Sequence, residues 1–131
     1  MPKVYVTKEF EFEACHHLTH YVGNCANLHG HTYKLQVTVS GEIPSPEQIT
    51  EEMYAEDSMV LDFKLLKRVV KDHILDTHDH SNLNDLYVQS TAEVMVVSMY
   101  QILREKLPKD VEIENVKLWE TSTSFAEYKG E

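Results

Sequence analysis

Basic residues are scarce in this sequence. Only 12 Lys and Arg side chains stand against 22 Asp and Glu side chains, which gives a formal net charge of −10 at pH 7. A nucleic-acid-binding protein needs a basic surface to neutralise phosphates, so the composition argues against a nucleic-acid partner. Net charge governs solubility and non-specific binding rather than the chemistry of one pocket. An anionic small-molecule substrate therefore stays compatible with the sequence if a few cations gather at the site.

Cysteine and long apolar runs are also lacking. Two cysteines, Cys15 and Cys25, do not make a disulfide framework, so we expect a cytoplasmic protein in a reducing environment, with a Cys15–Cys25 disulfide as the alternative. No apolar run approaches the roughly 20 residues of a membrane span. The first residues lead directly into a strand-like pattern, which predicts no signal peptide and no membrane partner.

The length of 131 residues predicts a single domain, residues 1–131, that can bury a core without disulfides. Apolar alternation predicts a strand over 3–16, a second over 31–41, a third over 111–119 with an irregularity near Asn115, and a short terminal strand over 125–128. Helical spacing predicts one helix from an Asp62 N-cap to about Thr77, with His73 on its apolar face or at the edge of that face. Residues 42–59 hold six acids and no base and are expected to be a solvated loop.

A capping box, Ser90-Thr-Ala-Glu93, predicts a second helix that starts with Ser90 as N-cap and runs to about Leu107. The predicted order ββααββ indicates an α+β fold, a four-stranded antiparallel sheet with two helices on one face. We expect the other face to keep Val, Leu and Tyr side chains and to be covered by self-association.

Three histidines form the candidate metal site. His29 and His31 are two residues apart, so in a strand both imidazoles point to one face. His16 ends the preceding strand on the face of Phe10 and Phe12. If the two strands pair antiparallel, the three imidazoles converge. Three nitrogen ligands with an open fourth position are typical of catalytic zinc. The alternative is that these are ordinary core or surface histidines.

Several motifs recur together in one family. They are Phe12-Glu-Ala-Cys-His-His-Leu18, Cys25-Ala-Asn-Leu-His-Gly-His31, Val60-Leu-Asp-Phe63, Asp79-His-Ser-Asn-Leu-Asn84, Ser90-Thr-Ala-Glu93 and Trp119-Glu-Thr121. In order and spacing the chain resembles the 6-pyruvoyltetrahydropterin synthase / QueD family from about residue 4 to residue 130. The resemblance implies the tunnelling fold, in which trimers close their sheets into a barrel, two trimers stack into a hexamer, and active sites lie between subunits.

The spacing of Cys25 separates two branches of that family. Three residues stand between Cys25 and His29, which resembles the branch that forms 6-carboxytetrahydropterin for queuosine synthesis; the pyruvoyl-forming branch has five. The resemblance implies that 7,8-dihydroneopterin triphosphate is converted to 6-carboxy-5,6,7,8-tetrahydropterin, with release of acetaldehyde and triphosphate. Three positions depart from the family pattern: Ser90 stands for Pro, Cys15 for Ala and His17 for Arg. We expect Ser90, as a good N-cap, to cause no functional loss.

The resemblance also assigns roles to site residues. Zn²⁺ on His16, His29 and His31 would bind the substrate's side-chain hydroxyls, and Cys25 would accept a proton as a thiolate. Asp79 and His80 would form a proton relay. Glu120 would hold the pterin by two parallel hydrogen bonds and take part in the relay.

Each of these residues has a plainer explanation. Cys25 could be a buried small side chain, Asp79-His80 a polar turn, and Glu120 an exposed acid at a strand end. Thr91 is a further candidate for substrate binding, and Glu93 could join it, but helix capping explains both. The alternatives for the whole chain are a pyruvoyl-forming synthase and a non-catalytic zinc- or pterin-binding module.

Overall fold

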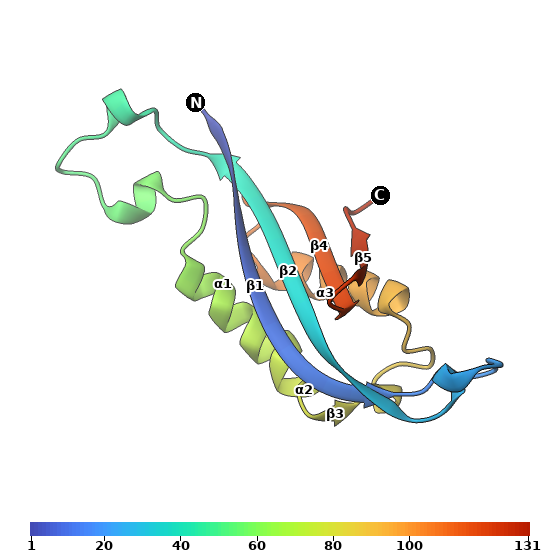
Figure 1. The fold of residues 1–131 in the computed structure, drawn as a ribbon. Helices are drawn as coiled ribbons and strands as arrows, with labels where there is room; N and C mark the ends of the chain where they lie inside the picture. Colours follow the sequence, from blue (N-terminus) through green and yellow to red (C-terminus); the bar gives the residue numbers. More distant parts are fainter.

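Two long strands organise the fold. In the computed structural model, which describes residues 1–131, β1 (Lys3–His16) and β2 (His29–Glu42) pair antiparallel over their full lengths and curve together as one hairpin (Figure 1). The antiparallel strands β4 (Glu112–Thr121) and β5 (Ser124–Tyr128) follow on the far side of β2. The predicted α+β arrangement with order ββααββ is thereby confirmed.

A fifth strand was not predicted. β3 (Ser81–Asn82) pairs parallel to the end of β1, which gives the sheet order β3-β1-β2-β4-β5. Two residues carry no alternation that a sequence pattern could reveal. The pairing matters because it attaches the segment that contains Asp79 and His80 to the outer edge of β1.

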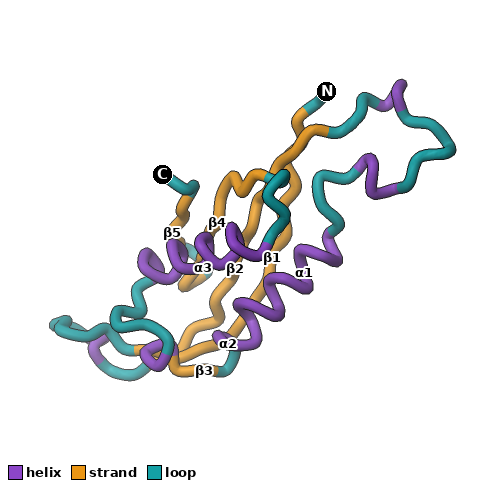
Figure 2. Tube along the Cα trace, turned by 180° about the vertical axis from the view of Figure 1, so that it is seen from behind, coloured by secondary structure: helices purple, strands orange, loops and turns teal.

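The helices cover one face of the sheet, as Figure 2 shows from behind. The first helical stretch is continuous and consists of α1 (Phe63–Val70), a π-helical turn (Lys71–Leu75) and α2 (Asp76–His78). The second is α3 (Ala92–Lys106). Asp62 caps α1 as predicted, because its side chain accepts a hydrogen bond from the backbone N–H of Lys64. None of these helices combines the length and the apolar character needed to cross a bilayer.

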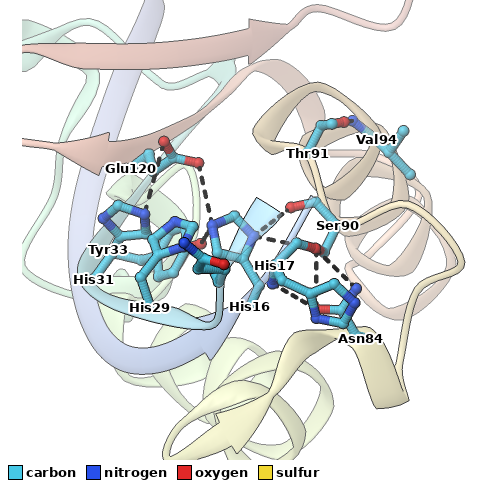
Figure 3. Close-up of polar contacts among 11 residues, drawn as sticks. His16, His17, His29, His31, Tyr33, Asn84, Ser90, Thr91, Val94 and Glu120 are labelled. Carbon is cyan, nitrogen blue, oxygen red and sulfur yellow. Dashed lines mark hydrogen bonds and ion pairs between the residues drawn. The ribbon is translucent and has the colours of Figure 1, made fainter. Parts of the chain in front are cut away.

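The predicted cap of α3 was wrong by one residue. Thr91, not Ser90, is the N-cap, and its hydroxyl accepts the backbone N–H of Val94 at 3.2 Å (Figure 3). Ser90 is fully buried one residue earlier. The two residues have similar capping preferences, so the sequence motif alone does not separate them.

The core lies between the sheet and the helices. Alternate residues of β1 and β2, among them Phe12, Tyr33 and Leu35, point toward the helices and are buried. The irregularity predicted near Asn115 is confirmed, because the β2–β4 register shifts at the partner of that residue, Thr38.

The expectation of an apolar second face was wrong. Residues of the opposite parity on the two long strands are mostly polar, and they are Lys3, Tyr5, Thr7, Glu9, Glu11, Glu13, Cys15, Gly30, Thr32, Lys34, Gln36, Thr38, Ser40 and Glu42. The error came from the Val and Leu side chains of β2, which share the parity of Tyr33 and belong to the core.

Candidate metal centre and active site

Three imidazoles converge at one end of the β1–β2 hairpin. His16 is the direct partner of His29 across the strand pair, and His31 lies opposite Ala14, so all three share the core-side face. Their ligand nitrogens lie within 4.8 Å of one another, a group that could hold a metal ion. In a tetrahedral zinc site these nitrogens would be about 3.3 Å apart. Small ring rotations would close the difference.

Backbone carbonyls fix the tautomers of two of these rings. The Nδ1 of His16 lies 2.9 Å from the carbonyl oxygen of Ser90, and the Nδ1 of His29 lies 2.8 Å from that of Asn27. A carbonyl oxygen only accepts hydrogen bonds, so each Nδ1 carries the hydrogen and each Nε2 keeps a lone pair. Metal-binding histidines are normally oriented in this way by such bonds.

The third ring, His31, also suits a metal. Its Nε2 is buried and has no hydrogen-bond partner. Burial lowers the pKa of His31 below its ordinary value. The charge of Glu120 acts in the opposite direction, and the charges of His29 and His16 lower the pKa further. A neutral imidazole with an unpaired buried nitrogen is the form that binds zinc. The residues present therefore fit the metal that the resemblance implies.

Two further groups face the three histidines (Figure 3). The carboxylate oxygens of Glu120 lie 3.8 Å from the Nε2 of His16 and 3.8 Å from the Nε2 of His31. The hydroxyl of Tyr33 lies 3.4 Å from the Nε2 of His16. Burial raises the pKa of Tyr33, with Glu120 adding to the effect, so its hydroxyl stays protonated. Tyr33 was not among the site residues predicted from the sequence.

Asp79 and His80 form a pair at the sheet edge. An oxygen of Asp79 lies 3.1 Å from the Nδ1 of His80 and also accepts the backbone N–H of Glu13 at 2.9 Å. That backbone bond is the main reason that the pKa of Asp79 lies below its usual value. The side chain of His80 is 78% exposed, and its backbone has φ of 58°. Such a conformation is unfavourable for a residue with a Cβ and is more frequent at functional sites.

The structure separates Cys25 from that pair. Cys25 is free and exposed in a 3₁₀ turn (Asn24–Ala26) of the loop between β1 and β2, so it is not a buried core thiol. The pocket beside His80, about 540 Å³, is lined by the other thiol, Cys15, and not by Cys25. Cys15 is also free, so there is no Cys15–Cys25 disulfide.

A second pocket, of about 490 Å³, brings Glu120 together with Glu93 from the start of α3 and Phe125 from β5. Its size suits a small organic ligand. Thr91 does not line it, and its hydroxyl caps α3. The sequence explains Glu93 by the capping box alone. In the structure, Glu93 also lines this pocket together with Glu120.

Comparison with known proteins identifies the class. Residues 5–131 match the family described as 6-pyruvoyl tetrahydropterin synthase, and the chain belongs to that family. A 6-carboxy-5,6,7,8-tetrahydropterin synthase from Haemophilus influenzae is 33% identical over 95% of this chain and 97% of its own length. A dihydroneopterin monophosphate aldolase from Pyrococcus furiosus is 34% identical over 83% of this chain and 82% of its own length.

Solved structures agree with the family assignment. The chain is similar to the 6-pyruvoyl tetrahydropterin synthase of Caenorhabditis elegans, with a TM-score of 0.81, 28% identity, and coverage of 100% of this chain and 98% of the other. The Plasmodium vivax enzyme, at 17% identity and a TM-score of 0.74, supports the fold alone. The predicted family membership and the predicted fold of the single tunnelling-fold chain are confirmed, and the chain is a pterin-synthase-type enzyme.

Proposed function

We propose that this chain is a zinc-dependent carbon–carbon lyase that converts 7,8-dihydroneopterin triphosphate and one water molecule to 6-carboxy-5,6,7,8-tetrahydropterin, acetaldehyde and triphosphate, for queuosine synthesis. The observation that carries the proposal is the group of three imidazoles with free Nε2 lone pairs in His16 and His29. The three-residue gap between Cys25 and His29 supports the carboxy branch, as does the similarity to 6-carboxy-5,6,7,8-tetrahydropterin synthases from Haemophilus influenzae, Aquifex aeolicus and Synechocystis.

The proposed site uses His16, His29 and His31 as zinc ligands. A bound zinc ion supplies positive charge that acidifies the substrate's side-chain hydroxyls and stabilises negative charge as it develops on them. The half-buried His31, with its buried Nε2, and the oriented rings of His16 and His29 hold the ligand set ready. Pre-orientation of this kind reduces the rearrangement needed when the metal binds.

Proton transfer is assigned to three residues. Cys25 accepts a proton from a side-chain carbon of the substrate, because its exposed thiol can become a thiolate near positive charge. His80 then exchanges the proton, and Asp79 fixes the imidazole by the contact to Nδ1. Since Cys25 and His80 line no common pocket within one chain, we propose that each site combines them from two subunits of a hexamer.

The pterin ring is placed in the pocket of Glu93 and Glu120. The carboxylate of Glu120 can accept two parallel hydrogen bonds from the amino group and the adjacent ring N–H of a pterin. Glu120 also lies within reach of the histidine group, so the substrate's side chain would point toward the metal. Thr91 keeps only a supporting role at the start of α3.

Product analysis tests the proposal. Zinc-loaded protein is incubated with dihydroneopterin triphosphate, the pterin is identified by mass spectrometry, and acetaldehyde is assayed. A carboxypterin with an equal amount of acetaldehyde is expected. A pyruvoylpterin without acetaldehyde would assign the chain to the other branch. Turnover only of a monophosphate substrate would favour the activity named for the Pyrococcus relative.

Metal binding is checked separately. We expect the double variant His29→Ala with His31→Ala to lose tight zinc binding, because only one imidazole of the group would remain. Zinc retained at wild-type affinity would refute the ligand assignment. A wild-type protein that binds zinc but turns over no pterin would leave the non-catalytic binding module as the better description.

A further inference from the structure

The ring of His16 is held on the side opposite the proposed metal. Its Nδ1 lies 2.9 Å from the carbonyl oxygen and 3.1 Å from the hydroxyl oxygen of Ser90 (Figure 3). Both residues are buried, His16 with 1% and Ser90 with 0% of its surface exposed. Water therefore does not compete for these bonds, and Ser90 determines which nitrogen of His16 carries the hydrogen.

Asn84 holds the adjacent backbone at two points. Its side-chain oxygen accepts the N–H of His17 at 2.9 Å, and its side-chain nitrogen donates to the carbonyl oxygen of His17 at 3.0 Å. These two bonds are complementary only in one orientation of the amide, so the oxygen and nitrogen positions are fixed. The end of β1 is thereby tied to the segment that precedes α3.

Ser90 completes the same network. Its hydroxyl donates to the carbonyl oxygen of His17 at 3.3 Å, which leaves a lone pair of the hydroxyl oxygen directed at the Nδ1–H of His16. Every polar group of the network has a partner of the matching kind. If these hydrogen bonds served only to hold a loop in place, they would not need to include the Nδ1 of His16, a candidate metal ligand.

We propose that Asn84 and Ser90 are positioning residues that hold His16 in the Nδ1–H tautomer with its Nε2 directed at the metal position. The proposal rests on the proposed zinc site but names residues outside it. It also assigns Ser90 a role in orienting His16, whereas the sequence suggested Ser90 only as a helix cap. Groups that orient a metal ligand in this way typically contribute about 10–100-fold to metal affinity.

Two substitutions test the network. Asn84→Asp keeps the shape but replaces the donor to the His17 carbonyl by an oxygen, and Ser90→Ala removes the hydroxyl while keeping the carbonyl. We expect zinc affinity, measured by chelator competition, to fall about 10–100-fold in Asn84→Asp and about tenfold in Ser90→Ala. The visible spectrum of the cobalt-substituted protein should also change, because it reports ligand geometry.

Ser40→Ala is the matched control. Ser40 is equally buried, and its hydroxyl donates to the side chain of Glu114 at 2.6 Å, at the far end of the same strand pair. This variant should lose stability without a change in zinc affinity or in the cobalt spectrum. Equal zinc affinity in wild type, Asn84→Asp and Ser90→Ala would overturn the proposal.

The tautomer itself can be read without metal. Long-range ¹H–¹⁵N spectra of metal-free wild-type protein, labelled at histidine, should show His16 with its hydrogen on Nδ1. A hydrogen on Nε2 would refute the proposal even if every variant failed to fold. A wild-type protein that binds no zinc but shows the Nδ1–H form would refute the proposed function and support the orienting role of Ser90.

Discussion

Cys25 is an exposed thiol on a loop, four positions ahead of His29 in the proposed zinc group. We predict that Cys25→Ala lowers turnover by about 10²–10⁴-fold, the usual contribution of a general base. Zinc affinity should stay at the wild-type value, because the thiol lies outside the group of three imidazoles. Initial rates of product formation and chelator competition measure the two effects.

The variant His29→Ala with His31→Ala provides the contrast, since it should lose both zinc and turnover. If Cys25→Ala instead turned over substrate at close to the wild-type rate, the proton acceptor would have to be another residue. A parallel loss of zinc in Cys25→Ala would mean that the thiol is a ligand.

Single residues also show where sequence reasoning reaches its limit. The positions of His16, His29 and His31 followed from the two-residue period of strands, and the structure brings them together. The bond from His16 to Ser90 could not be predicted, because it joins residues 74 positions apart. Local patterns carry no information on such a contact.

At the scale of the element, a π-helical turn (Lys71–Leu75) interrupts the first helix and inserts one extra residue. The sequence predicted His73 on the apolar face of this helix or at the edge of that face. In the structure His73 is exposed, while Ile74 and His78 are buried. No residue in that segment signals the turn.

Buried His78 gives the helix end a pH dependence. Its Nδ1 donates to the carbonyl oxygen of Ile74 and its Nε2 accepts from the hydroxyl of Tyr87, both at 2.7 Å. Burial lowers the pKa of His78 below its ordinary value of 6.5. The unfolded chain therefore binds a proton at a higher pH than the folded chain, and stability falls as the pH drops below 6.5.

We predict that this loss is smaller in His78→Gln. The measurement is the urea midpoint of wild type and variant, both metal-free, at several pH values between about 7 and 5. The two proteins share every other ionisable group, so the difference between the two curves isolates His78. Parallel curves would contradict the predicted role of its protonation.

For the whole molecule, the question is which subunit supplies each catalytic group. The second face of the sheet is polar, so burial of an apolar surface gives no reason for the chains to associate. The proposal that they associate therefore rests on the arrangement of the site. Asp79 and His80 project from the edge of β1, and Cys25 lies on the loop beyond its end. We propose that two incomplete sites of this kind are completed when chains associate.

Mixing of inactive variants tests this arrangement. We predict that Cys25→Ala and His80→Ala proteins, each inactive alone, regain activity after unfolding and refolding together, because roughly a quarter of the mixed sites would contain both native groups. Light scattering would report the size of the assembly. Absence of recovery in a correctly sized assembly would place both groups on one chain.

All three proposed ligands lie within residues 16–31, on two strands that follow each other in the sequence and are joined by the loop of residues 17–28. Contacts with short sequence separation form early, since their loop-closure entropy is small. Metal could thus be captured before the helices dock. We predict faster refolding when zinc is present from the start than when it is added late, and no such difference in His29→Ala with His31→Ala. Equal rates in the wild type would show that the hairpin binds zinc only after the helices have packed against it. Zinc would then bind at the end of folding instead of nucleating it.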